Sequence, residues 1–224
     1  MDKNKSKYSL KLLLVAFISF LIIPLGQISH LGDFLYKKIY YGTLTDMFNY
    51  VIQAIIWGVS ALLVCHFSKK KLGFSPLIDK KEKEYLPIPN MLILTLLTIL
   101  PILLVSGLIG WNFKPIYDLG TYFTGLNLLS QVVNLLSKVF MLMPVYMIIR
   151  SSQEAGENLF PKYKYIPYGA IGSLLTFGLY ELILQVHYLP ITYLLIIFAM
   201  FYQYIFSKKT YSKAFILMVL IYLV

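Results

Sequence analysis

Apolar residues occur along this chain in long runs, without the alternation that is typical of a membrane β-barrel. A helix that crosses a bilayer needs about 20 mostly apolar residues, with about 17–25 tolerated. Lipid offers the backbone no hydrogen-bond partner, so we expect these runs to be helical. Seven are predicted, the last of them short for a full crossing: residues 9–28, 47–67, 90–110, 124–149, 167–186, 188–206 and 213–224.

The composition supports a membrane protein. Hydrophobic residues make up 58% of the 224 residues and charged residues only 13%, whereas a soluble domain carries about 25% charged residues. The mean hydropathy is +0.72. The first run lacks a small-x-small cleavage site after it, so we interpret it as a retained span. The prediction is an all-α, polytopic helix bundle that forms one integral membrane domain over residues 1–224.

The basic residues alternate between the two predicted sides of the bundle. Sixteen of the twenty Lys and Arg residues fall on one side, three fall on the other (Lys37, Lys38 and Lys114), and Lys138 lies within a span. This asymmetry predicts a cytoplasmic N-terminus and cytoplasmic loops at 68–89 and 150–166. The net charge of +10 comes from lysines that flank the apolar runs, which is the pattern of membrane topology. We therefore expect the lipid bilayer as a partner and expect no nucleic acid. The excess of Lys over Arg, with many Ile, Tyr, Phe and Asn, suggests a bacterial cell membrane.

Two charged residues, Lys138 and Glu181, lie well inside the predicted spans. An ionisable residue at such a position costs about 2.5–3.5 kcal/mol on insertion scales. At 1.5 Å per residue, both lie at about 18–21 Å from the same predicted edge of the membrane. We therefore hypothesise that the two side chains form a salt bridge, because pairing would make both charges tolerable.

Polar residues accompany Lys138 at helical spacing. The steps from Asn127 to Gln131, Asn134 and Lys138 are four, three and four residues, which places them on one helix face. Two interpretations remain open: hydrogen bonds between helices, each worth about 0.6 kcal/mol, or a hydrophilic cavity, which Lys138 favours. The predicted polar pocket consists of Lys138, Glu181, Asn134, Gln131, Asn127, Asn49 and Gln53.

The supply of metal ligands is poor. A zinc site needs at least three converging ligands, and His30, His66 and His187 are scattered over different span ends. The single cysteine, Cys65, lies in an apolar run and is interpreted as a packing residue. The sequence contains no HExxH, no GxSxG and no glycine-rich phosphate loop. We therefore predict no metal, no cofactor and no catalytic residue from these motifs.

From about residue 60 onward, the order of features resembles the CAAX-protease and bacteriocin-processing (CPBP, or Abi) family of intramembrane endopeptidases. That family carries EExxxR after a proline, then FxxxH, then a late HxxxN or HxxxD. Here Pro144 and Arg150 match the first motif, but Val145 and Tyr146 stand where the paired glutamates would be. Phe177 opens a segment similar to the second motif.

The departures from the family pattern concern its catalytic residues. Glu181 replaces the second-motif histidine, and Leu220 stands roughly at the position of the third-motif histidine. Arg150 and Phe177 are motif remnants. The resemblance therefore implies a bundle of the same type without hydrolytic chemistry, binding a membrane or peptide partner as a scaffold or as a bacteriocin self-immunity factor. Two alternatives are an active intramembrane peptidase and a small solute-binding transporter subunit with a mid-membrane polar cavity.

Overall fold

All of the regular secondary structure in the described part of the chain is helical. The computed structural model describes residues 3–30, 43–77, 126–163, 166, 168–178 and 180. Its long helices are α1 (Lys3–Leu25), α3 (Thr43–Leu72) and α6 (Leu126–Leu159). Its short elements are η1 (Gly26–His30), η2 (Pro161–Tyr163), α7 (Tyr168–Ser173) and the π-helical turn η3 (Leu174–Gly178).

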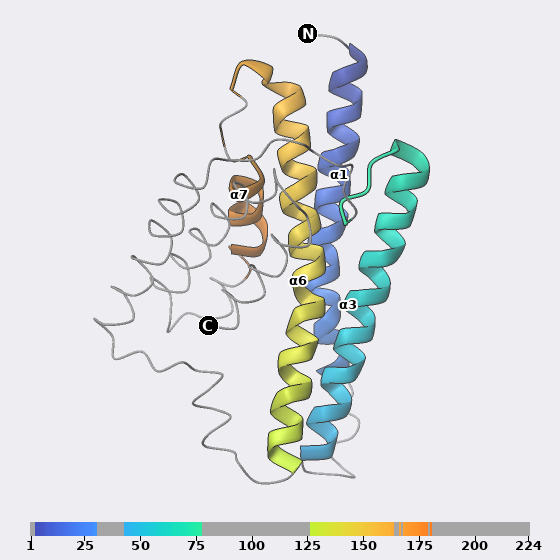
Figure 1. Ribbon diagram of the computed structural model, residues 1–224, viewed down its shortest axis with the longest axis vertical. Helices are drawn as coiled ribbons and strands as arrows, with labels where there is room; N and C mark the ends of the chain where they lie inside the picture. Colours follow the sequence, from blue (N-terminus) through green and yellow to red (C-terminus); the bar gives the residue numbers. More distant parts are fainter. Residues whose placement is uncertain are drawn as a thin grey trace, which may run out of the picture.

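The three long helices lie side by side, and α7 packs on the later half of α6 (Figure 1). Helix α1 runs in one direction, and α3 and α6 both run in the other. The beginning of α1 and the ends of α3 and α6 therefore lie at the same end of the bundle. Helix α6 is the central element because it contacts α1, α3 and α7.

The long helices α1, α3 and α6 are each long and apolar enough to cross a membrane. They contain 23, 30 and 34 residues, which corresponds to lengths of about 35–50 Å against a hydrocarbon core of about 30 Å. The prediction of helices with the length and apolar composition of a membrane span is confirmed for these three. The predicted segments 90–110, 188–206 and 213–224 lie outside the described residues.

Helix α1 buries small and polar residues beside apolar ones and exposes many of its large apolar side chains. On α1, the buried face carries Ser9, Leu12, Ala16, Ser19 and Ile23 at alternating steps of three and four residues. Large apolar side chains point outward instead: Leu10, Leu13, Leu14, Phe17, Ile18 and Leu21 are 38–62% exposed. Exposed apolar surface of this extent is stable only against lipid or another apolar partner.

The helix boundaries differ from the predicted ones. Helix α1 begins and ends earlier than the predicted span 9–28, and α3 is longer than 47–67 at both ends. The prediction of a loop at 150–166 is wrong for its first part, because α6 continues to Leu159. Ser151, Ser152 and Gln153 suggested a loop by their polarity, but they are buried in helix contacts.

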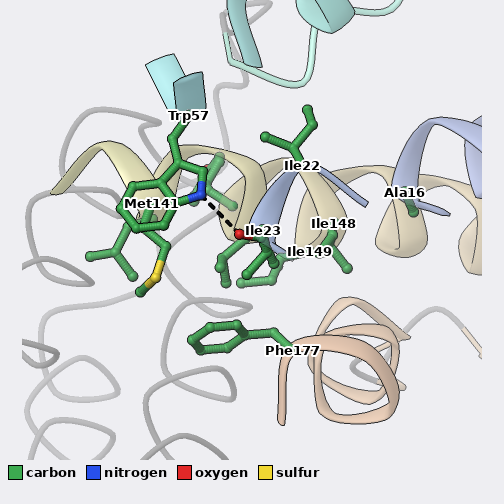
Figure 2. Packing of buried hydrophobic residues seen from close by; sticks show 11 residues of the cluster. Ala16, Ile22, Ile23, Trp57, Met141, Ile148, Ile149 and Phe177 are labelled. Atoms are coloured by element: carbon green, nitrogen blue, oxygen red, sulfur yellow. Dashed lines mark hydrogen bonds between the residues drawn. The ribbon is translucent and has the colours of Figure 1, made fainter. Parts of the chain in front are cut away.

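The main hydrophobic cluster joins all the long helices near the end of α1. Here Trp57 of α3 donates its indole N–H to the carbonyl oxygen of Ile23, with a distance of 3.0 Å between Nε1 and O (Figure 2). Ile23 lies in the last turn of α1, where carbonyl groups lack a partner within the helix. Gly26 follows, and a Cβ atom there would overlap the Trp57 ring. The indole thus satisfies a helix end that glycine leaves accessible.

Helix α3 ends at a glycine and the chain then folds back. Gly73 has φ +64° and donates its N–H to the Lys69 carbonyl, which is the bond of a left-handed C-terminal cap. The Ser68 hydroxyl donates to the Phe74 carbonyl at 2.9 Å. Leu77 packs against the hydrophobic core. The start of the predicted loop 68–89 is therefore partly helix and partly a segment that returns onto the bundle.

We predict that Trp57→Phe lowers the free energy of unfolding by about 1–3 kcal/mol, because the buried Ile23 carbonyl loses its donor. Thermal unfolding of the detergent-purified protein measures the effect. Phe67→Leu is the matched control, since Phe67 on the same helix is 54% exposed. Equal losses in the two variants would contradict the structural role of the indole hydrogen bond.

Candidate functional site

The polar residues of α3 and α6 are unequally buried. Asn49 and Gln53 of α3 are 4% and 5% exposed, whereas Gln131, Asn134 and Lys138 of α6 are half-buried. Ser130 and Ser137, which flank the α6 stripe, are more deeply buried than the stripe itself. The serines therefore lie on the most buried side of α6, and the longer polar side chains lie beside that side.

The contacts between α3 and α6 fix the levels at which these residues lie. A Cβ atom at Gly58 would come within 2.9 Å of the Phe140 ring. In the same register, Ala61 and Cys65 pack with Met143 and Met147. Because the two helices are parallel, counting back from these contacts places Asn49 at the level of Gln131. Gln53 falls between the levels of Asn134 and Lys138.

The structure thus brings the polar residues of both helices to one stretch of the bundle about three turns long, here called the polar level. Ser137 donates to the Asn134 carbonyl at 2.7 Å, and Asn49, Gln53 and Lys138 are also engaged in interactions. Asn127 begins the same stretch of α6. Such a level can hold a polar solute or join the helices through hydrogen bonds. Glu181 lies outside the described residues, so its pairing with Lys138 stays a prediction.

The positions that resemble the family's motifs lie apart from this polar level. Val145 and Tyr146 follow Lys138 on α6 by about two turns. Val145 and Tyr146 are 0% exposed and share one cluster with Phe177 of η3, which is 1% exposed. Figure 2 shows Trp57 and Phe177 on opposite sides of aliphatic residues that include Ile149. Apart from the Tyr146 hydroxyl and the Trp57 N–H, the side chains of this cluster are apolar.

Arg150, the other motif remnant, follows this cluster on α6. It is half-buried and engaged in an interaction. Its guanidinium is a donor without acceptor capacity, so it can hold an anionic or carbonyl group in place but cannot act as a general base.

Helices α6 and α7 pack through small residues. A Cβ atom would overlap the Tyr168 ring at Gly156, the Ile149 carbonyl at Gly169 and the Ser152 hydroxyl at Gly172. Glycines at these positions let the two backbones approach closely, as in other membrane helix pairs. Helix α7 in turn contacts η3, whose Phe177 belongs to the same buried cluster as Val145 and Tyr146.

The sequence interpretation missed Gln153, which is 6% exposed and joins α6 to Ile166 and to the first turn of α7. Its Oε1 accepts the Gly169 N–H at 2.9 Å. Its Nε2 donates to Glu157 Oε1 at 2.7 Å and to the Ile166 carbonyl at 3.4 Å. The four-residue spacing of Gln153 and Glu157 is the signal that could have indicated a helix here instead of a loop.

Candidate metal ligands are dispersed in the described part of the chain, which holds no group of three or more His, Cys, Asp or Glu residues suited to a metal ion. His66 is exposed and meets the neighbouring Phe67 ring edge-on. Cys65 is buried, with its Sγ 3.3 Å from the Ser75 hydroxyl.

Comparison with known proteins returned no matching family model, no matching curated sequence and no matching solved structure.

The pairing of Lys138 with Glu181 predicts non-additive mutations. Lys138→Met or Glu181→Leu alone should cost about 3–5 kcal/mol, because each leaves an uncompensated buried charge, and the double variant should be near neutral. Thermal stability of the three variants in detergent forms a double-mutant cycle. Additive losses would show that the two charges do not interact.

Proposed function

We propose that this chain is a non-catalytic membrane protein of CPBP type that works by binding a membrane protein or peptide, as a scaffold or as a bacteriocin self-immunity factor. The carrying observation is the apolar cluster at the motif positions. Val145, Tyr146 and Phe177 lie there with Ile23 and Trp57. The family's hydrolytic chemistry would need charged and imidazole side chains at comparable positions.

The environment of these positions supports the loss of catalysis. A carboxylate that replaced Val145 would be buried among aliphatic and aromatic side chains, where an unpaired charge costs several kcal/mol. Water activation by a general base also requires the base to reach the proton that it removes. Val145 and Phe177 can neither take up a proton nor coordinate a metal, so the described cluster supports packing and not hydrolysis.

The polar level shared by α3 and α6 favours a second candidate, a solute-binding transporter subunit. Asn49 and Gln53 offer amide donors and acceptors at a depth where most neighbours are apolar, and Lys138 adds a positive charge. Asn49 and Gln53 lie in the first three turns of α3, and buried polar groups within a span often mark a substrate path. The third possibility, an active peptidase, would have to rely on Glu181 as its acid or base.

For the topology we propose a bacterial cell membrane, seven crossings and a cytoplasmic N-terminus. The directions of the helices support this arrangement. The lysines that begin α1 and the lysines that end α3 lie at the same end of the bundle, together with Lys162 after α6 (Figure 1). The sequence assigns all of these to the cytoplasmic side.

We predict that the purified, reconstituted protein does not cleave peptides, with or without added zinc. The assay incubates it with a peptide library in liposomes and detects products by mass spectrometry. A second sample is purified in mild detergent from native membranes, and native mass spectrometry measures the mass of the intact complex. A bound polypeptide at fixed stoichiometry is expected, and a bound small molecule instead would favour the transporter candidate.

Glu181→Gln is the matched variant for this assay, because it keeps the size of the side chain and removes its charge. Cleavage by the unmodified protein that is lost both in Glu181→Gln and after addition of a chelator would overturn the non-catalytic proposal.

A further inference from the structure

Two sets of exposed lysines on neighbouring helices form a basic surface at one end of the bundle. Helix α1 begins with Lys5, Lys7 and Lys11, and α3 ends with Lys69–Lys71. All six side chains are exposed. From this arrangement we propose that the α1–α3 end is a binding site for the phosphodiester headgroups of anionic phospholipids.

Three contacts fix the levels at which these lysines lie. The hydrogen bond from Trp57 to Ile23 aligns α3 with α1. The contact of Gly58 with Phe140 aligns α3 with α6. The electrostatic interaction of Tyr8 with Glu154 aligns α1 with α6 and agrees with the register that the first two contacts imply.

Counting along the antiparallel pair from the Trp57 contact places Lys11 at the level of Lys69. Lys7 lies one turn farther toward the end of the bundle. The ammonium groups of α1 and α3 therefore share one level, although they lie far apart in the sequence.

This basic level borders the lipid-facing surface. On α1, Leu13 and Leu14 are 40% and 55% exposed, within one turn after Lys11. On α3, Leu63 and Phe67 are 52% and 54% exposed, within two turns before Lys69. Lysine stems lie along apolar surface and extend their charge toward the headgroups. The ammonium groups are thus placed at the depth where lipid phosphates lie.

Lysines outnumber carboxylates among the described residues at this end of the bundle. The six lysines lie near two carboxylates, Glu154 beside Tyr8 and Glu157, which accepts a hydrogen bond from Gln153. In the described part of the chain, no ion pair joins a carboxylate to Lys7, Lys11 or Lys69. The described side chains at this end thus carry a net positive charge, which favours binding of an anion from outside the protein. A phosphodiester that is anchored in the membrane already lies at the required depth, unlike free phosphate.

The test uses the full chain in nanodiscs of phosphatidylcholine with increasing phosphatidylglycerol, and spin-labelled lipids report the preference for the anionic species. The triple variant Lys7→Gln, Lys11→Gln and Lys69→Gln should lose the preference, by about fivefold for each lysine that contacts a headgroup. The corresponding triple Arg variant should retain it, because the charge is kept.

The charge-matched control changes Lys37, Lys38 and Lys114 to Gln, at positions that the sequence assigns to the opposite side. This control variant should keep its preference for the anionic lipid. An equal loss of preference in the control would show that only the net charge matters, which would overturn the proposed site. If the triple Gln variant of α1 and α3 kept its lipid selectivity, these lysines would affect only the orientation of the helices in the membrane. That result would also overturn the proposed lipid site. Displacement of the lipid by inorganic phosphate beyond that by chloride at equal ionic strength would assign the site to free phosphate instead.

Discussion

Within a bilayer, apolar side chains gain little by leaving lipid for protein, so helices hold together where their backbones can approach and their polar groups find partners. The contacts of this bundle follow that constraint. Gly26 makes room for the Trp57 ring, Gly58 lies against Phe140, and Gly169 lies against the carbonyl of Ile149. Ser9 and Ser19 satisfy their buried hydroxyls within α1, each by donating to a carbonyl oxygen one turn earlier. Close packing of small residues therefore positions α6 between its neighbours.

The packing of the helices determines where the residues of the candidate site lie. Because α7 packs closely on α6, Phe177 is held against the apolar cluster that includes Val145 and Tyr146. Because α3 and α6 are parallel and in register, the amides of Asn49 and Gln53 come level with the polar stripe of α6. One level of the bundle is thus polar and the next is apolar, and the two levels support different proposals for function.

Much of the fold could be predicted from hydrophobicity, since the apolar runs that became α1, α3 and α6 have the length of a span. The extension of α6 to Leu159 could not, because Ser151–Gly156 is polar and small, a composition that indicates a loop unless a helix packs on it. The pairing of Gln153 with Gly169 depends on that tertiary contact. Helical spacing did place Gln131, Asn134 and Lys138 together, but burial of the adjacent Ser130 and Ser137 depends on how α6 is rotated against α1 and α3.

The central claim is that α3 turns its exposed apolar side chains toward lipid and the face that carries Gln53, Trp57 and Ala61 toward the neighbouring helices. Spin labels placed singly along residues 48–67 of α3 test it most directly, by collision with oxygen in lipid and with a nickel complex in water. The account predicts a helical period, with oxygen maxima at Val51, Ile55, Val59 and Leu62 and minima at Gln53, Trp57 and Ala61. Oxygen maxima at the second set of positions, or strong nickel collisions at the first, would contradict it.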